Sequence, residues 1–357
     1  MAHRMEYIRK IMEDEGLDGF LITSRQNTFY FTNFTGSTSK CLVTKEKAYL
    51  VVDFRYTAQA KQQVFPGIEV IEHEKSANDT LNDLCISENV HTLGIEGEDV
   101  TFSGYRSLQE SLTGVKNFRD LQNKLNDARI IKDEVEISKI QKAVDIADMV
   151  FEHILPFLKP GAREADIAAE MEYKMKKLGA SRPSFETIVA SGPRSALPHG
   201  VAGMRELKPG DAVVLDFGAV IEGYCSDITR TVFIGKPADE LLKIYNIVLE
   251  AQLEALNRAA AGMTGRELDG YARTIIYNAG YEKCFGHGLG HGVGLEIHEK
   301  PYVSQRGDDV LRSGMVFTVE PGIYVEGLGG VRIEDTVLLA DNGLKILTKS
   351  PKDLIVL

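Results

Sequence analysis

Five side chains that can bind metal ions lie in the C-terminal part of the sequence, each in a short apolar or glycine-rich context. They are four carboxylates and one imidazole: Asp216, Asp227, His291, Glu320 and Glu334. This set of ligands suits two hard or borderline divalent cations, and pairs of such cations catalyse the hydrolysis of strong bonds. The sequence therefore predicts a site for two metal ions.

Asp216 and Asp227 lie on either side of a turn signal. Glu222-Gly223 separates the apolar run that ends at Asp216 from an alternating run that follows Asp227. A turn centred between Ile221 and Glu222 would make the two aspartates cross-strand partners, with Cβ atoms roughly 5 Å apart. Because like charges in that position destabilise a hairpin, we expect a cation to lie between them.

The other three candidates lie in weaker local patterns. His291 belongs to a stretch of alternating glycines, where small residues let the backbone approach a ligand closely. Glu320 ends an apolar strand before a Pro-Gly turn, and alternation along a later strand puts Arg332, Glu334 and Thr336 on one face. Taken singly, the histidine is also typical of an ordinary loop and each glutamate of a solvated surface. Only their joint occurrence favours a metal site.

The first third of the chain alternates short apolar runs with amphipathic stretches. Strands are expected at 19–22, 48–52, 69–71 and 92–95, with helices at 5–15, 55–64 and 78–88. Such alternation predicts an α/β domain with helices packed on a sheet. We expect the chain to divide into domains at 1–128 and 129–357.

The second predicted domain contains a diverged internal repeat. The sequence Arg-Glu-Ala-Asp at 163–166 returns as Arg-Glu-Leu-Asp at 266–269, and each copy opens a predicted helix that stops at a glycine, Gly179 or Gly280. A His-Gly pair follows each copy. Long helices are expected before the copies, at 134–155 and 239–260. These features predict a pseudo-twofold domain with a central site between its halves.

The composition excludes several classes of function. The net charge is −11 and no long basic block is present, which argues against nucleic acid as a partner. No apolar run approaches the roughly 18 residues of a membrane span, and the first residues are too charged for a secretory signal. Four scattered cysteines without a CxxC pair are typical of a reducing cytoplasm and exclude a cysteine zinc site.

The segments around the candidate ligands resemble a known family. Residues 130–357 resemble the metallopeptidases with the pita-bread fold, which include Xaa-Pro aminopeptidase, prolidase and methionine aminopeptidase. Residues 1–128 resemble the creatinase/prolidase N-terminal domain. The resemblance lies in the segments Leu215–Gly218, Ser226–Thr231, His287–Glu299, Glu320–Tyr324 and Gly330–Asp335.

The resemblance implies a role for each candidate ligand. Asp227 and Glu334 would bridge two metals, Asp216 would complete one of them, and His291 with Glu320 would complete the other. A hydroxide held between the cations would be the nucleophile. Glu320 would carry the proton from the attacking water to the leaving amine. Manganese is favoured by carboxylate-rich ligation, while cobalt, zinc and iron stay open.

Four further residues match functional positions of the family. His199 and His298 would contact the substrate and stabilise the tetrahedral intermediate, and His287 matches a histidine near the proline-binding pocket. Arg332 would orient the ligands from behind. Homodimers are common in the family, so a homodimer is expected.

The resemblance also narrows the substrate class to proline-containing peptides. The extra N-terminal domain favours the proline-specific branch over methionine aminopeptidase, and the complete ligand set argues against creatinase. We expect an Xaa-Pro dipeptidase, with Xaa-Pro aminopeptidase as the alternative for longer peptides. Tyr302 stands where several prolidases have an arginine for the dipeptide carboxylate, and the nearest arginine is Arg306. A non-hydrolytic binding protein on the same fold is a distant alternative, and a dinuclear phosphatase lacks recognisable phosphate-binding basic residues.

Overall fold

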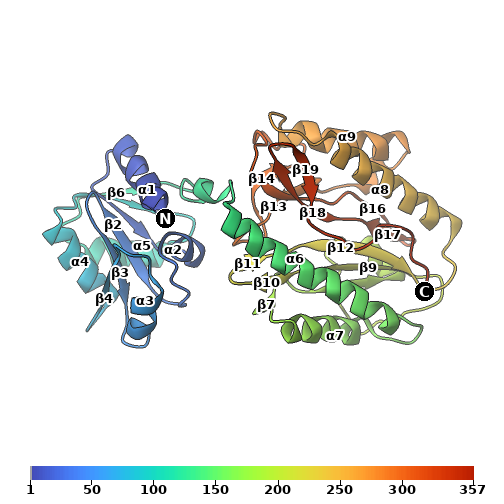
Figure 1. Ribbon diagram of the computed structural model, residues 1–357, viewed down its shortest axis with the longest axis horizontal. Helices are drawn as coiled ribbons and strands as arrows, with labels where there is room; N and C mark the ends of the chain where they lie inside the picture. The colour runs from blue at the N-terminus through green and yellow to red at the C-terminus, as the bar shows by residue number, and fades with distance from the viewer. Residues whose placement is uncertain (1) are drawn as a thin grey trace. The chain divides into compact units, whose positions relative to one another are not determined.

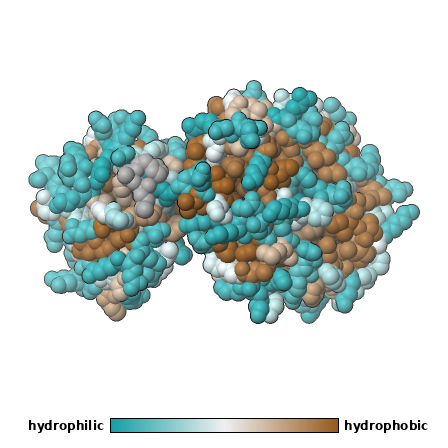
Figure 2. Space-filling model, in the orientation of Figure 1, coloured by the Kyte–Doolittle hydropathy of each residue, from teal (hydrophilic) through white to brown (hydrophobic). Residues whose placement is uncertain are grey.

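The computed structural model describes residues 2–357, and the chain divides into two compact units between Arg129 and Ile130. Both units combine helices and strands, so the predicted α/β class is confirmed (Figure 1). Hydrophilic and hydrophobic residues are interspersed over the visible face of each unit (Figure 2). Within the described residues, none of the helices has the length and apolarity that a membrane crossing requires.

The first unit is built on one mixed sheet with the strand order β4-β3-β2-β1-β5-β6. The central strand β1 pairs antiparallel with β2 and parallel with β5. The strands are β1 Gly19–Ile22, β2 Lys40–Thr44, β3 Ala48–Val52, β4 Glu69–Glu72, β5 Thr92–Ile95 and β6 Asn117–Asp120. The helices are α1 Ala2–Glu15, α2 Arg25–Thr32, α3 Thr57–Gln63, α4 Ala77–Ser87 and α5 Phe102–Ser111, with a short 3-10 turn, η1 Asn126–Arg129.

The sequence patterns located the apolar strands of this unit and missed others. Helix α2 carries threonine and aromatic residues that favour strands, yet it is helical. The Ser24 side chain caps it by accepting from the Asn27 N–H. The buried Glu96 carboxylate, distant in sequence, accepts from the Ser24 N–H at 2.8 Å and from the Thr23 N–H at 2.5 Å. A long-range contact therefore holds the start of this helix.

The second unit contains the two predicted pairs of helices. The long helices are α6 Glu134–Ile154 and α8 Asp239–Arg258, and each precedes a shorter one, α7 Glu164–Lys177 or α9 Gly265–Asn278. Both shorter helices end before a glycine with positive φ, 101° at Gly179 and 91° at Gly280. In Figure 1 the α6–α7 pair and the α8–α9 pair lie on opposite sides of the strands. The predicted pseudo-twofold arrangement is confirmed.

Each half of the second unit has its own strands and core. The first half contributes β7 Arg182–Pro183, β8 Ile188–Ser191, β9 Ala212–Phe217, β10 Ala219–Ile221, β11 Tyr224–Cys225 and β12 Ile228–Phe233. The second half contributes β13 Gly290–Gly292, β14 Glu299–Val303, β15 Val316–Val319, β16 Gly322–Val325, β17 Gly329–Arg332, β18 Asp335–Ala340 and β19 Gly343–Ile346. Short 3-10 turns are η2 Leu155–Phe157, η3 Gly192–Ala196 and η4 Glu282–Cys284. One apolar cluster packs α6 and α7 on the first set of strands, and another packs α8 and α9 on the second.

The hairpin that carries Asp216 and Asp227 differs from the prediction. The strand register places Asp216 opposite Thr229, so the two aspartates are not direct cross-strand partners. The turn lies one position later than expected, because Glu222 and Gly223 occupy its two central positions with φ of 49° and 89°. The error is two residues in register, which leaves both aspartates on the same face of the hairpin.

The predicted continuous strand through Arg332, Glu334 and Thr336 is also wrong. β17 ends at Arg332, β18 begins at Asp335, and the two strands belong to different sheets. At the break the Glu334 N–H donates to the Thr229 carbonyl at 3.1 Å, which joins the second half of the unit to the first. Arg332, Glu334 and Thr336 nevertheless all contact residues 227–229, as their predicted common face requires.

Candidate metal centre

The nine side chains singled out in the sequence line one cavity of about 400 Å³ in the second unit. Asp216 lies on β9, Asp227 directly before β12, His291 on β13, Glu320 directly after β15, and Glu334 between β17 and β18. The remaining four are His199 after η3, His287 before β13, His298 before β14 and Arg332 at the end of β17. Both halves of the unit thus contribute to one site.

Three of the five predicted ligands form a tight group. Ligand atoms of Asp227, His291 and Glu334 all lie within 4.8 Å of one another. His291 Nε2 is 3.6 Å from Asp227 Oδ2 and 3.2 Å from Glu320 Oε1, which brings a fourth ligand to the group. The fifth, Asp216, lines the same cavity.

Three carboxylate oxygens of the five predicted ligands are buried and have no hydrogen-bond partner among the described residues: Asp216 Oδ1, Asp227 Oδ1 and Glu334 Oε1. Burial, together with the neighbouring carboxylates, raises the pKa of Asp227 and of Glu334 well above the usual range. Buried polar atoms are almost always satisfied in folded proteins. Divalent cations would satisfy these oxygens and remove the repulsion, so the donor set fits metal ions.

His291 is oriented as a metal ligand would be. Its Nδ1 lies 3.1 Å from the Gly292 carbonyl oxygen, which can only accept a hydrogen bond. Nδ1 therefore carries the proton in the neutral ring, and the lone pair of Nε2 points to the carboxylates. When no cation binds Nε2, His291 can instead be protonated there; burial would raise the pKa of Glu320, but the hydrogen bond and charge of the protonated His291 outweigh it and lower that pKa to about 2. Glu320 is thus an ionised carboxylate in the group.

Arg332 lies behind the carboxylates and is buried. Its guanidinium donates to Asp216 Oδ2, to Thr229 Oγ1 at 3.0 Å and to the Tyr324 hydroxyl at 2.8 Å. Thr229 Oγ1 in turn donates to Glu334 Oε2 at 2.6 Å. Arg332 therefore contacts one predicted ligand directly and another through Thr229.

The same arginine is linked to His287 through Tyr324. His287 Nδ1 lies 2.7 Å from the Gly288 carbonyl oxygen and must donate to it, so Nε2 accepts from the Tyr324 hydroxyl at 2.9 Å. Burial lowers the pKa of His287, which keeps its ring neutral. Burial also raises the pKa of Tyr324 to about 12, so its hydroxyl keeps the proton that it donates.

His199 and His298 are exposed at the cavity, one on each half of the unit. The His298 ring lies edge-on to the His291 ring, with centroids 4.3 Å apart. His199 lies on a loop whose two ends are held by the buried Glu164 carboxylate. Glu164 accepts from the Ser191 N–H at 2.8 Å and from the Gly203 N–H at 3.1 Å.

The second half holds its histidine loop in a similar way. Asp269 accepts from the Leu289 N–H at 3.0 Å and pairs with Arg273, whose guanidinium donates to the His287 carbonyl at 2.7 Å. In each half, a buried acid near the start of the shorter helix therefore fixes the loop that carries a cavity histidine.

Sequence reasoning did not single out Thr229, Thr318 and Tyr324. Thr318 Oγ1 donates to Glu320 Oε1 at 3.0 Å and accepts from the His291 N–H at 3.1 Å. Thr229 lies two residues after Asp227, and Thr318 lies two residues before Glu320, in each case along the path of the same strand. Alternation along a strand puts such residues on the ligand's face, which is the signal that could have found them.

Eight further residues complete the cavity wall, and all but one of them are apolar or glycine: Phe185, Glu186, Ile188, Pro198, Val201, Gly288, Gly290 and Ile297. Arg332 is the one arginine or lysine among the described residues that line it. Arg306, the candidate for binding a dipeptide carboxylate, is exposed and does not belong to this set.

Comparisons with known proteins agree with this geometry. Residues 138–341 match metallopeptidase family M24, and residues 4–131 match the creatinase/prolidase N-terminal domain. A protein of Pyrococcus furiosus named Xaa-Pro dipeptidase is 43% identical, with 99% of this chain and 100% of that protein covered.

Solved structures match as well. An Xaa-Pro dipeptidase from Bacillus anthracis superposes with a TM-score of 0.97 at 45% identity, over 100% of this chain and 99% of that one. An X-Pro aminopeptidase from Thermotoga maritima superposes with a TM-score of 0.90 at 44% identity, covering 96% and 98% of the two chains. With its unsatisfied carboxylates gathered at one cavity and its likeness extending over nearly the whole length, this chain belongs to metallopeptidase family M24.

Proposed function

We propose that this protein hydrolyses the peptide bond on the amino side of proline, with two divalent metal ions held by Asp216, Asp227, His291, Glu320 and Glu334. The main support is the set of three buried, unsatisfied carboxylate oxygens beside His291 and Glu320. These five side chains would together hold the ions, with Asp227, His291 and Glu334 at the centre of the group. When bound, the ions supply Lewis-acid polarisation of the scissile carbonyl and lower the pKa of the attacking water.

The side chains around the ions carry out the proton transfer and the orientation of the substrate. Glu320 takes the proton of the attacking water and passes it to the proline nitrogen as that nitrogen leaves. His199 and His298, exposed at the cavity, donate to the oxygen on which negative charge develops. His287 contributes to the wall that meets the proline ring, and Arg332 keeps Asp216 oriented.

The cavity supports a small proline-containing substrate. Its volume of about 400 Å³ is in the range of sites for small ligands. Phe185, Pro198 and Ile297 offer apolar surface to a pyrrolidine ring. We propose an Xaa-Pro dipeptidase, in keeping with the names of the relatives from Pyrococcus furiosus and Bacillus anthracis.

The second candidate is an Xaa-Pro aminopeptidase, which acts on longer peptides. Two observations favour it: the similar Thermotoga maritima protein is named X-Pro aminopeptidase, and Arg306 does not line the described cavity. A dipeptidase must bind a free carboxylate, which needs a positive or hydrogen-bonding group, whereas an aminopeptidase must leave room for the rest of the chain.

Comparing kcat/KM for an Xaa-Pro dipeptide with that for its C-terminally extended tripeptide distinguishes the two. The proposed dipeptidase prefers the dipeptide. A preference for the tripeptide that Arg306→Ala leaves unchanged would assign the protein as an aminopeptidase. Hydrolysis of neither peptide by metal-loaded protein would contradict both and favour a non-hydrolytic binding protein.

We also propose manganese as the metal, since carboxylate-rich ligation suits it, although the imidazole also suits cobalt, zinc or iron. The resemblance to the family supports a homodimer, and the scattered, unpaired cysteines support a reducing cytoplasm. Light scattering during size-exclusion chromatography tests the dimer.

A further inference from the structure

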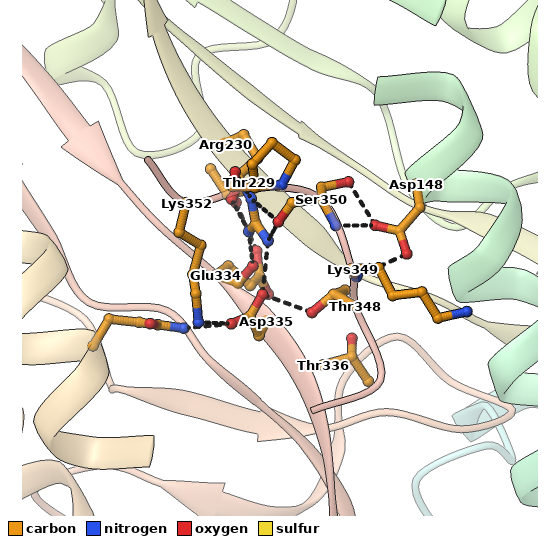
Figure 3. A network of polar contacts seen from close by, with 12 residues as sticks. Asp148, Thr229, Arg230, Glu334, Asp335, Thr336, Thr348, Lys349, Ser350 and Lys352 are labelled. Carbon is orange, nitrogen blue, oxygen red and sulfur yellow. Dashed lines mark hydrogen bonds and ion pairs between the residues drawn. The ribbon is translucent and has the colours of Figure 1, made fainter. Parts of the chain in front are cut away.

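The strands that carry the metal centre have a second, buried polar layer on their other face. Successive residues of a strand point to opposite sides. Thr229 faces the site and reaches Glu334, while its neighbour Arg230 faces away. Glu334 likewise faces the site while Asp335 faces away, and Arg230 Nη2 meets Asp335 Oδ1 at 2.8 Å (Figure 3).

Asp335 is the centre of this layer and is 1% exposed. Besides Arg230, it accepts from Thr348 Oγ1 at 2.6 Å, from Lys352 Nζ at 2.6 Å and from Gln252 Nε2 at 2.8 Å. Asp335 therefore pairs with two cationic side chains, those of Arg230 and Lys352.

Arg230 connects this layer to the backbone of the site. Its Nη1 donates to the carbonyl of Glu334 and, at 2.9 Å, to that of Thr229. Its Nη2 donates to the Ser350 carbonyl at 2.7 Å. The guanidinium thereby holds the peptide units from which Glu334 and Thr229 project. Thr336, on the face of Glu334, donates from its Oγ1 to the Asp227 carbonyl at 2.7 Å.

The C-terminal segment, residues 347–357, brings Thr348 and Lys352 to this layer. Asp148 on α6 accepts from the N–H groups of Lys349 at 2.9 Å and Ser350 at 2.8 Å. The Tyr245 hydroxyl donates to the Lys352 carbonyl at 3.0 Å. Asp148 thus fixes the segment between Thr348 and Lys352, and Tyr245 fixes it at Lys352 itself; Figure 3 shows the contacts of Asp148.

We propose that Lys352 and Thr348 are positioning residues of the metal centre, which act through Asp335 and Arg230 on the placement of Glu334. The inference rests on the proposed metal site. Residues that hydrogen-bond to metal ligands typically increase metal affinity, and their removal weakens metal binding by about 10–100-fold. Lys352 touches no metal-binding atom, so its effect must pass through this network.

The variant Lys352→Met distinguishes a positioning role from a purely electrostatic one, because the two roles predict opposite changes in the affinity for Mn²⁺. Removing a positive charge near an anionic site would tighten cation binding if only the field mattered. If Lys352 positions the site, Mn²⁺ binding instead weakens by about 10-fold, at the lower end of the range for such partners. Calorimetric titration of metal-depleted protein with Mn²⁺ measures this directly, without reference to activity.

Three variants complete the test. Lys352→Arg keeps the charge and should restore affinity. Lys349→Met removes an equal charge from the same segment, where Lys349 pairs with the exposed Asp145, and should bind Mn²⁺ as the wild type does. Thr348→Val removes one hydroxyl donor to Asp335 without any change of charge, and should weaken binding several-fold even if Lys352→Met fails to fold.

The outcomes distinguish this inference from the function on which it rests. Unchanged or tighter Mn²⁺ binding by Lys352→Met, unchanged binding by Thr348→Val, or equal weakening by Lys349→Met would overturn the positioning role alone. A wild-type protein that bound no divalent cation would contradict the proposed metal site itself.

Discussion

Glu320 and Glu334 lie opposite each other in the hairpin that links two sheets of the second unit. The pairing of β15 with β18 continues without a shift into the pairing of β16 with β17: Val319 faces Asp335, and Gly322 faces Arg332. Both glutamates lie between these two strand pairs, so the same register places them opposite each other. Their backbone N–H groups bond outside the hairpin, that of Glu320 to the Leu289 carbonyl and that of Glu334 to the Thr229 carbonyl. The facing carboxylates that we expected for the two aspartates are thus found here, where a cation can lie between them.

Asp227→Asn should remove bound metal. Asp227 has ligand atoms close to those of His291 and Glu334, and one of its buried oxygens has no partner among the described residues. Loss of its negative charge should therefore weaken metal binding at the centre. Elemental analysis after dialysis should find a large deficit relative to the wild type. Asp166→Asn, at an exposed aspartate of the same unit, is the control and should keep its metal. A full two-metal complement in Asp227→Asn would show that the assigned ligands are wrong.

Glu320→Gln should lower kcat by about 10²–10⁴-fold, because the amide cannot take up the proton of the attacking water. Glu326→Gln, at an exposed position of the same hairpin, should leave kcat unchanged. His199→Ala and His298→Ala should also lower kcat but retain metal, since neither histidine is a proposed ligand. Near-normal turnover by Glu320→Gln would exclude the proposed proton transfer.

Glu164→Ala should destabilise the second unit by about 3 kcal/mol, since it leaves the Arg194 guanidinium and the N–H groups of Ser191 and Gly203 without their acceptor. The midpoint of thermal denaturation should fall accordingly, and the loop that carries His199 should become more sensitive to protease. Asp166→Asn on the same helix breaks only an exposed pair with Arg163 and should leave the midpoint unchanged. Equal midpoints for the two variants would refute the anchoring role of Glu164.

The candidate site residues could be proposed from the sequence because their chemistry is concentrated in short motifs. All nine predicted side chains line one cavity. The register of the aspartate hairpin could not be predicted to the residue. Its two-residue turn has positive φ at Glu222, a residue type that rarely signals such a turn. Because strand faces alternate with a period of two, an error of two residues left the chemistry of the prediction intact.

The supporting contacts depend on packing between distant segments and were not predictable. The repeated motif aligns Glu164 with Glu267 and Asp166 with Asp269, yet the buried members are Glu164 and Asp269. Which acid is buried is decided by the loop that packs on each helix. Nothing in the local pattern identified Lys352 as a partner of Asp335, which lies 17 positions away in the sequence.

Cys41 and Cys85 should resist thiol reagents in the folded protein. Burial raises the pKa of Cys41 to about 12 and that of Cys85 to about 11, so both remain protonated at pH 8, where thiol reagents attack only the thiolate. Cys284 is the least buried of the four cysteines and should react first. Titration with a chromogenic disulfide before and after unfolding in guanidinium measures this. Rapid reaction of three or more thiols in the native state would contradict the burial of these side chains.

The central claim is that metal ions bound at the Asp227 centre hydrolyse bonds to proline. The most direct measurement compares Ala-Pro with Ala-Ala as substrate, for metal-depleted protein before and after addition of Mn²⁺. The proposed function predicts no hydrolysis without metal, and hydrolysis of Ala-Pro well above that of Ala-Ala once Mn²⁺ is added. Hydrolysis of Ala-Pro that persists in fully metal-depleted protein, or equal rates for the two dipeptides, would contradict it.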